Sequence, residues 1–140
     1  MAKKKNVWEA VEEALRAVFP YPYPETNWKG EPIKDDELED YYDPSDDPLI
    51  PFLTGQKIKA AQQLGIAAQG IEFVEFQGSF WENVGYDQTP QGTEDECEAI
   101  IKIADKHYKV LLMYRSTGGY YLDQEAYEVV PKTVEVVIYE

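Results

Sequence analysis

The chain has 140 residues, and its 27 acidic side chains outnumber the 13 basic ones, which leaves a formal net charge of −14. This length is typical of one domain whose hydrophobic core needs neither disulfides nor a structural metal. The excess negative charge disfavours nucleic acid and anionic membranes as partners, and indicates basic protein partners or simple solubility. We therefore expect a single domain over residues 1–140, no cofactor, and no direct binding of nucleic acid or membrane.

The chain has a single cysteine, Cys97, which cannot form an intramolecular disulfide. A lone thiol on an apolar strand face is typical of a buried structural side chain, and a reducing cytoplasm suits it. The basic first residues lead into an amphipathic, acid-containing segment, so no signal peptide is expected. No apolar window is long enough to span a bilayer, and we expect a cytoplasmic protein.

Residues 1–55 are expected to form an N-terminal helix and an irregular acidic arm. Asn6 can cap a helix whose apolar residues recur at helical spacing until Pro20: Val7, Trp8, Val11, Ala14, Leu15 and Val18. Residues 21–24 alternate tyrosine and proline, which favours an extended segment with tyrosines free to pack. The apolar run at residues 48–53 should anchor the arm to the core.

The acidic arm is the run from residue 35 to residue 47, which contains eight carboxylates and no basic side chain: Asp35, Asp36, Glu37, Glu39, Asp40, Asp43, Asp46 and Asp47. Tyr41 and Tyr42 interrupt this run. The commoner explanation of such a run is a solvated loop that keeps the protein soluble. An interaction surface is the alternative, because aromatic side chains anchor interfaces and spaced carboxylates can imitate a phosphate backbone.

We take the arm's carboxylates, with Tyr41 and Tyr42, as the primary contact with a partner. A second acidic group, close to the start of the predicted central hairpin, is a secondary contact: Glu94, Asp95, Glu96 and Glu98.

Residues 56–140 are expected to form a second helix and an antiparallel sheet. The helix should run from about residue 56 to residue 69 between Gly55 and Gly70, with these residues facing inward: Ile58, Ala61, Leu64 or Gly65, and Ala68. Strands are predicted at residues 71–77, 80–86 and 133–139, and residues 120–130 should cross the surface after a glycine turn.

Residues 97–115 are predicted to form the central hairpin, with its turn at Asp105 and Lys106 and Ala104 opposite His107. One face is then wholly apolar: Cys97, Ala99, Ile101, Ile103, Tyr108, Val110, Leu112 and Tyr114. A helix is the alternative over residues 94–107, because the apolar spacing also fits a helix that Thr93 and Glu96 could cap. The expected fold is α+β, with two helices packed on a curved antiparallel sheet or partial barrel of about five strands.

The last third also resembles a known group of proteins. Residues 97–140 contain two strands with a short turn, a glycine turn, Tyr-Tyr-Leu-Asp, Val-Pro-Lys-Thr-Val-Glu-Val and a terminal Tyr-Glu. This order is similar to the C-terminal part of small, acidic bacteriophage proteins. The resemblance implies a phage or prophage origin and action in the host bacterial cytoplasm, and it provides no catalytic residues.

For a phage protein, host nucleases and CRISPR effectors are the obvious partners, because they hold nucleic acid in basic grooves. The leading expectation is a non-enzymatic, anti-CRISPR-like inhibitor that acts as a nucleic-acid mimic. The first alternative is an acidic structural or accessory phage protein, and the second is a hydrolase with an unrecognised carboxylate site.

Motifs for other functions are weak. His107 is the single histidine and lies beside the predicted turn, without a serine or cysteine nucleophile in a recognisable setting. Residues 58–74 resemble a helix-turn-helix, but no basic side chain follows Lys59 until Lys102, so phosphate contacts are lacking.

The arm could hold a hard cation, but the glycine and terminal glutamate of a calcium loop are absent. We therefore expect no metal site.

Overall fold

The structure, a computed structural model, describes residues 5–78, 94–116 and 118–131. One antiparallel sheet contains the strands β1 (Ile71–Gln77), β2 (Glu94–Ile103), β3 (Lys106–Arg115) and β4 (Gly119–Val129), in chain order. The helices are α1 (Trp8–Arg16), α2 (Leu49–Leu53) and α3 (Ala60–Ala68), with two short 3-10 helices, η1 (Asp35–Tyr41) and η2 (Pro44–Asp46). The expected α+β class is confirmed. The described residues form three α-helices and four strands, compared with the two helices and about five strands that were expected.

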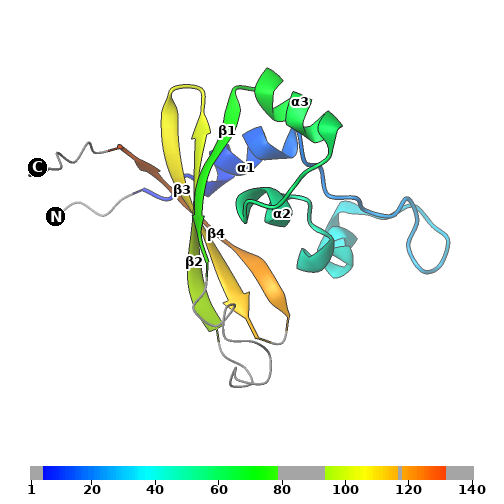
Figure 1. Ribbon diagram of the computed structural model, residues 1–140. Coiled ribbons are helices and arrows are strands. Elements are labelled where there is room, and N and C mark those ends of the chain that lie inside the picture. Colours follow the sequence, from blue (N-terminus) through cyan, green and yellow to red (C-terminus); the bar gives the residue numbers. More distant parts are fainter. Residues whose placement is uncertain (1–4, 79–93, 117, 132–140) are drawn as a thin grey trace, which may run out of the picture.

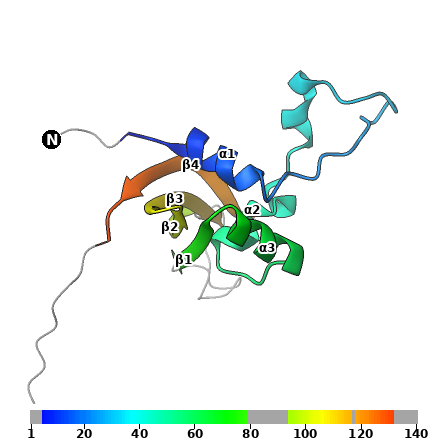
Figure 2. The same cartoon turned by 90° about the horizontal axis from the view of Figure 1, so that it is seen from above.

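The helices lie on one side of the curved sheet, with α1 along β4 and α3 beside β1 (Figures 1 and 2). Two bulges contribute to this curvature. In β1, Val74 has no partner in β2, and in β4 three residues between Leu122 and Ala126 lie opposite Leu111 alone. β1 and β4 do not pair with each other in the described part of the chain, so the sheet is open.

The hydrophobic core lies between these helices and the inner face of the sheet. Helix α1 contributes Trp8, Val11 and Leu15, and the sheet contributes Ile71, Cys97, Ala99, Ile101, Val110, Leu112 and Ala126. Four of the five residues of α2 are buried, and the rings of Phe19 and Phe52 stack with their centroids 4.9 Å apart. The expectation that residues 48–53 anchor the arm to the core is confirmed.

The first helix is confirmed. Its N-cap is Val7 and not Asn6 as predicted, although the Asn6 side chain still binds the first residue of the helix. The Asn6 Oδ1 atom accepts hydrogen bonds from the backbone N–H of Trp8, at 2.9 Å, and from that of Ala126 in β4, at 3.1 Å. The backbone N–H of Val7 also donates to the carbonyl of Ala126, at 2.8 Å. The residues before α1 therefore join the helix to the outer edge of β4.

The central hairpin is confirmed and the helix alternative for this segment is wrong. The register differs from the prediction, because His107 pairs with Lys102, and Ala104 and Asp105 form the turn. A shift of two residues keeps every side chain on its face, since side chains alternate with a period of two. The predicted apolar face is accordingly the inner face, where Cys97, Ile101 and other members of this set are buried.

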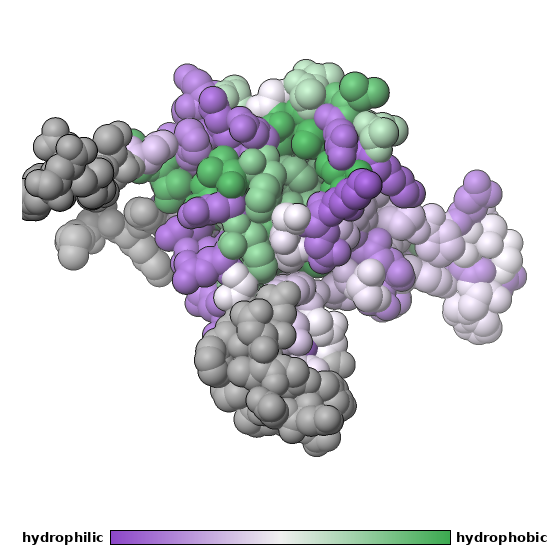
Figure 3. Space-filling model, viewed as in Figure 1, coloured by the Kyte–Doolittle hydropathy of each residue, from purple (hydrophilic) through white to green (hydrophobic). Residues whose placement is uncertain are grey.

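The second helix is shorter than predicted and lies at the edge of the fold. Of the residues expected to face inward, Ala61, Leu64 and Ala68 are exposed, Leu64 by 73%. Gly65 does lie close to the core, because a Cβ added there would come within 2.9 Å of a Val18 methyl group. Figure 3 shows the resulting apolar surface over α3 and β1.

The glycine turn after β3 is confirmed, but residues 120–130 are not a surface crossing, because nearly all of them belong to strand β4. Leu122 and Ala126 both face the core, because the bulge adds two residues to β4 and leaves the period of two intact. The exposed Gln124 between them interrupts the run of alternating apolar residues by which a strand is identified. The strands predicted at residues 80–86 and 133–139 lie outside the described residues. No helix in the described ranges is long and apolar enough to cross a membrane.

Candidate partner-binding site

The acidic arm lies on the helical side of the molecule and ends at α2 (Figure 1). Most of it is helical, in η1 and η2, where an irregular segment was expected. Six of its eight carboxylate residues are exposed: Asp35, Asp36, Glu39, Asp40, Asp43 and Asp46. These six side chains face solvent.

Asp47 is different, because it is an internal ion-pair residue with 1% of its surface exposed. Arg16 donates hydrogen bonds to both of its carboxylate oxygens, at 2.8 and 2.9 Å. The Tyr42 hydroxyl donates to Oδ2 at 2.7 Å, and the backbone N–H of Leu49 donates to Oδ1 at 3.0 Å. Asp47 therefore joins the arm to α1 and α2 and is not available to a partner, and Tyr42 is engaged with it.

The pKa values in this group follow from burial and hydrogen bonding. Burial alone would raise the pKa of Asp47, but the hydrogen bonds from Arg16, Tyr42 and the Leu49 amide lower it overall. Burial and the bond to Asp47 raise the pKa of the Tyr42 hydroxyl. Burial opposes the charge of Arg16, but its interaction with Asp47 raises its pKa overall. Asp47 and Arg16 therefore both stay ionised at neutral pH, and the Tyr42 hydroxyl stays protonated and donates its hydrogen bond to Asp47.

The other tyrosines hold the arm against residues 21–23. The Tyr21 hydroxyl donates to the carbonyl of Tyr41, at 3.1 Å, and accepts a hydrogen bond from the backbone N–H of Asp43, at 2.8 Å. The Tyr21 ring lies 4.4 Å from that of Tyr23 and 5.0 Å from that of Tyr42, between centroids. Tyr41 and Tyr42 therefore support the arm's shape more than they extend its surface.

Trp28 is an exposed aromatic residue that the sequence reasoning missed, with 83% of its surface accessible. Its loop is closed by a bridge between Thr26 and Pro32. The buried Asn27 side chain accepts hydrogen bonds from the backbone N–H groups of Lys29 and Glu31, at 2.9 and 3.0 Å. The signal in the sequence was Asn27-Trp-Lys-Gly, a turn pattern that leaves the second residue outside.

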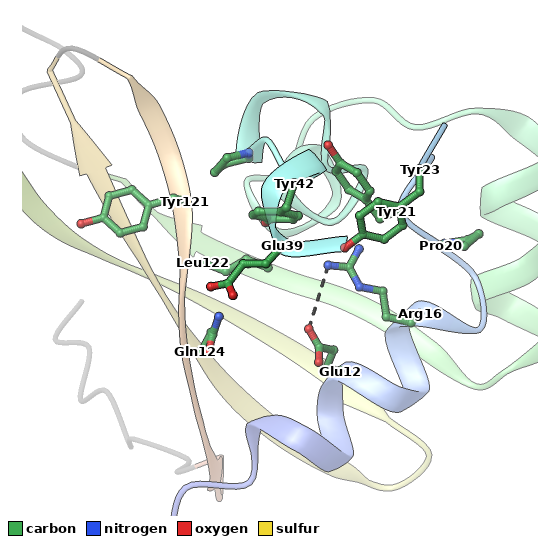
Figure 4. Close-up of a pocket in the computed structure, with 11 residues that line it drawn as sticks. Glu12, Arg16, Pro20, Tyr21, Tyr23, Glu39, Tyr42, Tyr121, Leu122 and Gln124 are labelled. Carbon is green, nitrogen blue, oxygen red and sulfur yellow. Dashed lines mark ion pairs between the residues drawn. The ribbon is translucent and has the colours of Figure 1, made fainter. Parts of the chain in front are cut away.

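A cleft of about 720 Å³ separates the arm from α1 and β4 (Figure 4). Arg16 and Glu12 of α1 line one side, and Glu39 and Tyr42 of the arm line another. Tyr121, Leu122 and Gln124 line it from β4. Glu39 is thus the one arm carboxylate among the residues that line this cleft.

The secondary acidic group lies on β2, and the structure does not bring it together with the arm. Glu94, Glu96 and Glu98 occupy every second position of β2, on the face opposite to the buried side chains of Cys97 and Ala99. Glu94 accepts hydrogen bonds from Arg115 at 2.7 and 3.1 Å, and Glu98 lies 3.6 Å from Lys109. Basic side chains of β3 therefore already offset part of this group, while Asp95 alternates toward the opposite face.

Cys97 and His107 are the residues that the sequence analysis considered for chemistry. Cys97 is buried in the core, and His107 lies partly buried in β3, next to the hairpin turn. Within residues 5–78, 94–116 and 118–131, no group of three or more His, Cys, Asp or Glu side chains could hold a metal ion. Comparison of the chain with models of known families, with curated proteins and with solved structures finds no match.

Proposed function

We propose that the chain is a non-enzymatic inhibitor that binds a basic, nucleic-acid-binding surface of a host defence protein, in an anti-CRISPR-like manner. One observation supports this proposal most. Four carboxylates of η1 are exposed, and none forms an ion pair with a described residue: Asp35, Asp36, Glu39 and Asp40. A solvated loop needs no such grouping, and the repulsion between like charges opposes it.

The physical basis of the proposed binding is charge complementarity. Arg and Lys side chains of a nucleic-acid groove normally contact phosphates, and a row of carboxylates offers them the same charge. Such contacts steer association and are screened by salt. The partner class, a host nuclease or CRISPR effector, follows from the phage resemblance of residues 97–140.

Trp28 is proposed as the aromatic anchor beside this charged surface. Exposed tryptophans are energetically unfavourable in water and are enriched among the residues that contribute most to interfaces. The hydrogen bonds of Asn27 and the bond from the Trp28 backbone N–H to the Tyr41 hydroxyl, at 3.2 Å, fix the loop before binding. A fixed loop loses little conformational entropy when the ring is buried by a partner.

The test begins with capture from a bacterial lysate on the immobilised chain, at low and at physiological salt. Captured proteins are purified, and their binding to the chain is measured with nucleic acid as competitor. We expect steep weakening with salt and mutual exclusion with nucleic acid. Simultaneous binding of the chain and nucleic acid would contradict the proposal.

The decisive variant changes Asp35, Asp36, Glu39 and Asp40 together to their amides. It should weaken binding at least about tenfold, since each lost charge contact contributes a few tenths to one kcal/mol. The matched control removes four exposed carboxylates elsewhere: Glu9, Glu13, Glu72 and Glu75. Both variants have the same net charge, so equal losses would show that overall charge, and not the arm, drives binding.

Trp28→Ala should add a loss that salt does not modify, because burial of an aromatic ring is not screened. Leu64→Ala, which removes another exposed apolar side chain, is its control.

The alternative of an acidic structural or accessory phage protein is favoured by a different observation. Leu64 and Val74 are exposed by 73% and 46%, and Figure 3 shows an apolar surface over α3 and β1. Such a surface suits assembly with other copies or with another structural protein. In that case sedimentation should show self-association that strengthens with salt, and Leu64→Asp should abolish it.

A further inference from the structure

The cleft between the arm, α1 and β4 combines aromatic walls with carboxylates. Figure 4 shows the carboxylates of Glu12, from α1, and Glu39, from η1, directed into the space in front of β4. The rings of Tyr21 and Tyr42, whose centroids are 5.0 Å apart, form part of its lining, and Tyr121 contributes from β4. The arrangement places negative charge beside aromatic rings within one concave site of about 720 Å³.

Arg16, the basic side chain among the described residues of the lining, does not neutralise these carboxylates. Its guanidinium donates two hydrogen bonds to Asp47 and one to the carbonyl of Phe19, at 3.2 Å. Glu12 reaches Arg16 only at 4.0 Å, and Glu39 forms no ion pair with a described residue. Because the charge of Arg16 is balanced by the buried Asp47, the carboxylates of Glu12 and Glu39 leave two negative charges in the cleft for a ligand.

We infer that this cleft binds one arginine side chain of the partner, an inference that rests on the proposed function. A guanidinium is planar and weakly hydrated, so it can stack on a tyrosine ring while donating hydrogen bonds to a carboxylate at its edge. A lysine ammonium is more strongly hydrated and has no face to stack. Arginine is also the residue that a nucleic-acid groove commonly directs toward phosphates.

The shape of the surface around the cleft fits an extended chain that carries this arginine. A smaller depression on one side shares Glu12 and Gln124 with the cleft, and another on the opposite side shares Pro44 and Tyr121. These depressions follow β4, so the backbone on either side of the arginine has room along the groove. The arginine would therefore come from an exposed loop or segment of the partner.

The test is a titration of the full-length, isotope-labelled chain with N-acetyl-arginine amide, followed by NMR. The signals of Glu12, Arg16, Glu39, Tyr42 and Leu122 should shift together. N-acetyl-citrulline amide, which is nearly isosteric but neutral, should bind at least about tenfold more weakly, because it lacks the charge. N-acetyl-lysine amide should bind about threefold or more weakly, because it cannot stack.

Variants locate the site. Glu39→Gln and Glu12→Gln should each weaken the arginine analogue several-fold, whereas Glu13→Gln, an exposed neighbour on α1, should leave it unchanged. Equal binding of citrulline, tighter binding of lysine, or shifts spread over all exposed carboxylates would overturn the inference. So would an unchanged affinity in the Glu12 and Glu39 variants.

The two proposals fail in different ways. If Glu12→Gln leaves binding of the captured partner unchanged while the fourfold arm variant loses it, the arginine inference fails and the proposed function stands. If the arginine analogue binds as expected but no captured protein competes with nucleic acid, the proposed function fails and the cleft remains a guanidinium site.

Discussion

At the scale of single residues, Asp47 connects the acidic arm to the core. It lies 31 residues from Arg16 in the chain, yet the two side chains form a two-bond ion pair at the junction of α1, η2 and α2. Loss of one partner of a buried ion pair costs about 3–5 kcal/mol. The lower end of this range applies here, because the Arg16 side chain is 23% exposed. The arm's position therefore depends on a carboxylate that belongs to its own acidic run.

Asp47→Asn should lower the free energy of unfolding by about 3 kcal/mol at pH 7. Because the pKa of Asp47 is lowered in the folded state, its stabilising contribution is present above the unfolded value of about 4 and is lost as pH falls through the folded value. Urea unfolding between pH 7 and pH 2 should show a smaller loss of stability in the variant. Asp46→Asn, at an exposed neighbour, should behave as the wild type. If Asp47→Asn and the wild type lost the same stability between pH 7 and pH 2, this role of Asp47 would be contradicted.

Gly55 and Gly30 allow backbone strain to be separated from a steric clash. Both have positive φ angles, +75° and +78°, but a Cβ on Gly55 would lie 3.0 Å from the Phe73 ring, while Gly30 has open space. Alanine should cost about 1 kcal/mol at Gly30 through strain, and about 1 kcal/mol more at Gly55 through the clash. Equilibrium unfolding measures both, and equal losses would show that the Phe73 ring yields without cost.

At the scale of elements, the β2–β3 hairpin decides how the sheet meets the helices. Its inner face is buried against α1 and α2, and its outer face carries a mixture of apolar and charged side chains. Adjacent residues of one strand therefore have very different surroundings.

Ile101→Asp should unfold the domain, because it places an unpaired carboxylate at a position with no exposed surface. Ile100→Asp should cost less, since Ile100 is only partly buried and pairs on the outer face with Lys109. Circular dichroism and thermal melting compare the two. Equal losses would show that the two faces of β2 do not differ as described.

At the scale of the whole molecule, repulsion among the excess negative charges opposes the close grouping of carboxylates in the arm. Changing Asp35, Asp36, Glu39 and Asp40 to amides reduces the net charge from −14 to −10, that is, −14 plus 4. The melting temperature should stay the same or rise by a few degrees at low salt, because repulsion is relieved, and the difference should vanish at high salt. Differential scanning calorimetry would measure this change, and a lower melting temperature would mean that these carboxylates hold the arm together.

The sequence by itself determined features that depend on neighbouring residues. The helical spacing of Trp8, Val11 and Leu15 identified α1. Phe and Val content identified β1, and alternation identified the inner face of the hairpin. The burial of Cys97 and the anchoring role of residues 48–53 followed from apolar character alone. These predictions succeeded because side-chain periodicity is a local property of helices and strands.

Only the tertiary structure decided which acidic residues are internal and which face solvent. Asp46 and Asp47 are adjacent members of the same acidic run, and the contact with Arg16 of the distant helix α1 makes Asp47 a buried ion-pair residue. Strand β4 was not predicted, because the exposed Gln124 interrupts its run of alternating apolar residues. The cleft was not predicted either, because it combines α1, the arm and β4, whose residues are far apart in the chain. A charge run shows how many carboxylates are present, whereas contacts between distant segments determine their solvation, because burial depends on the packed neighbours.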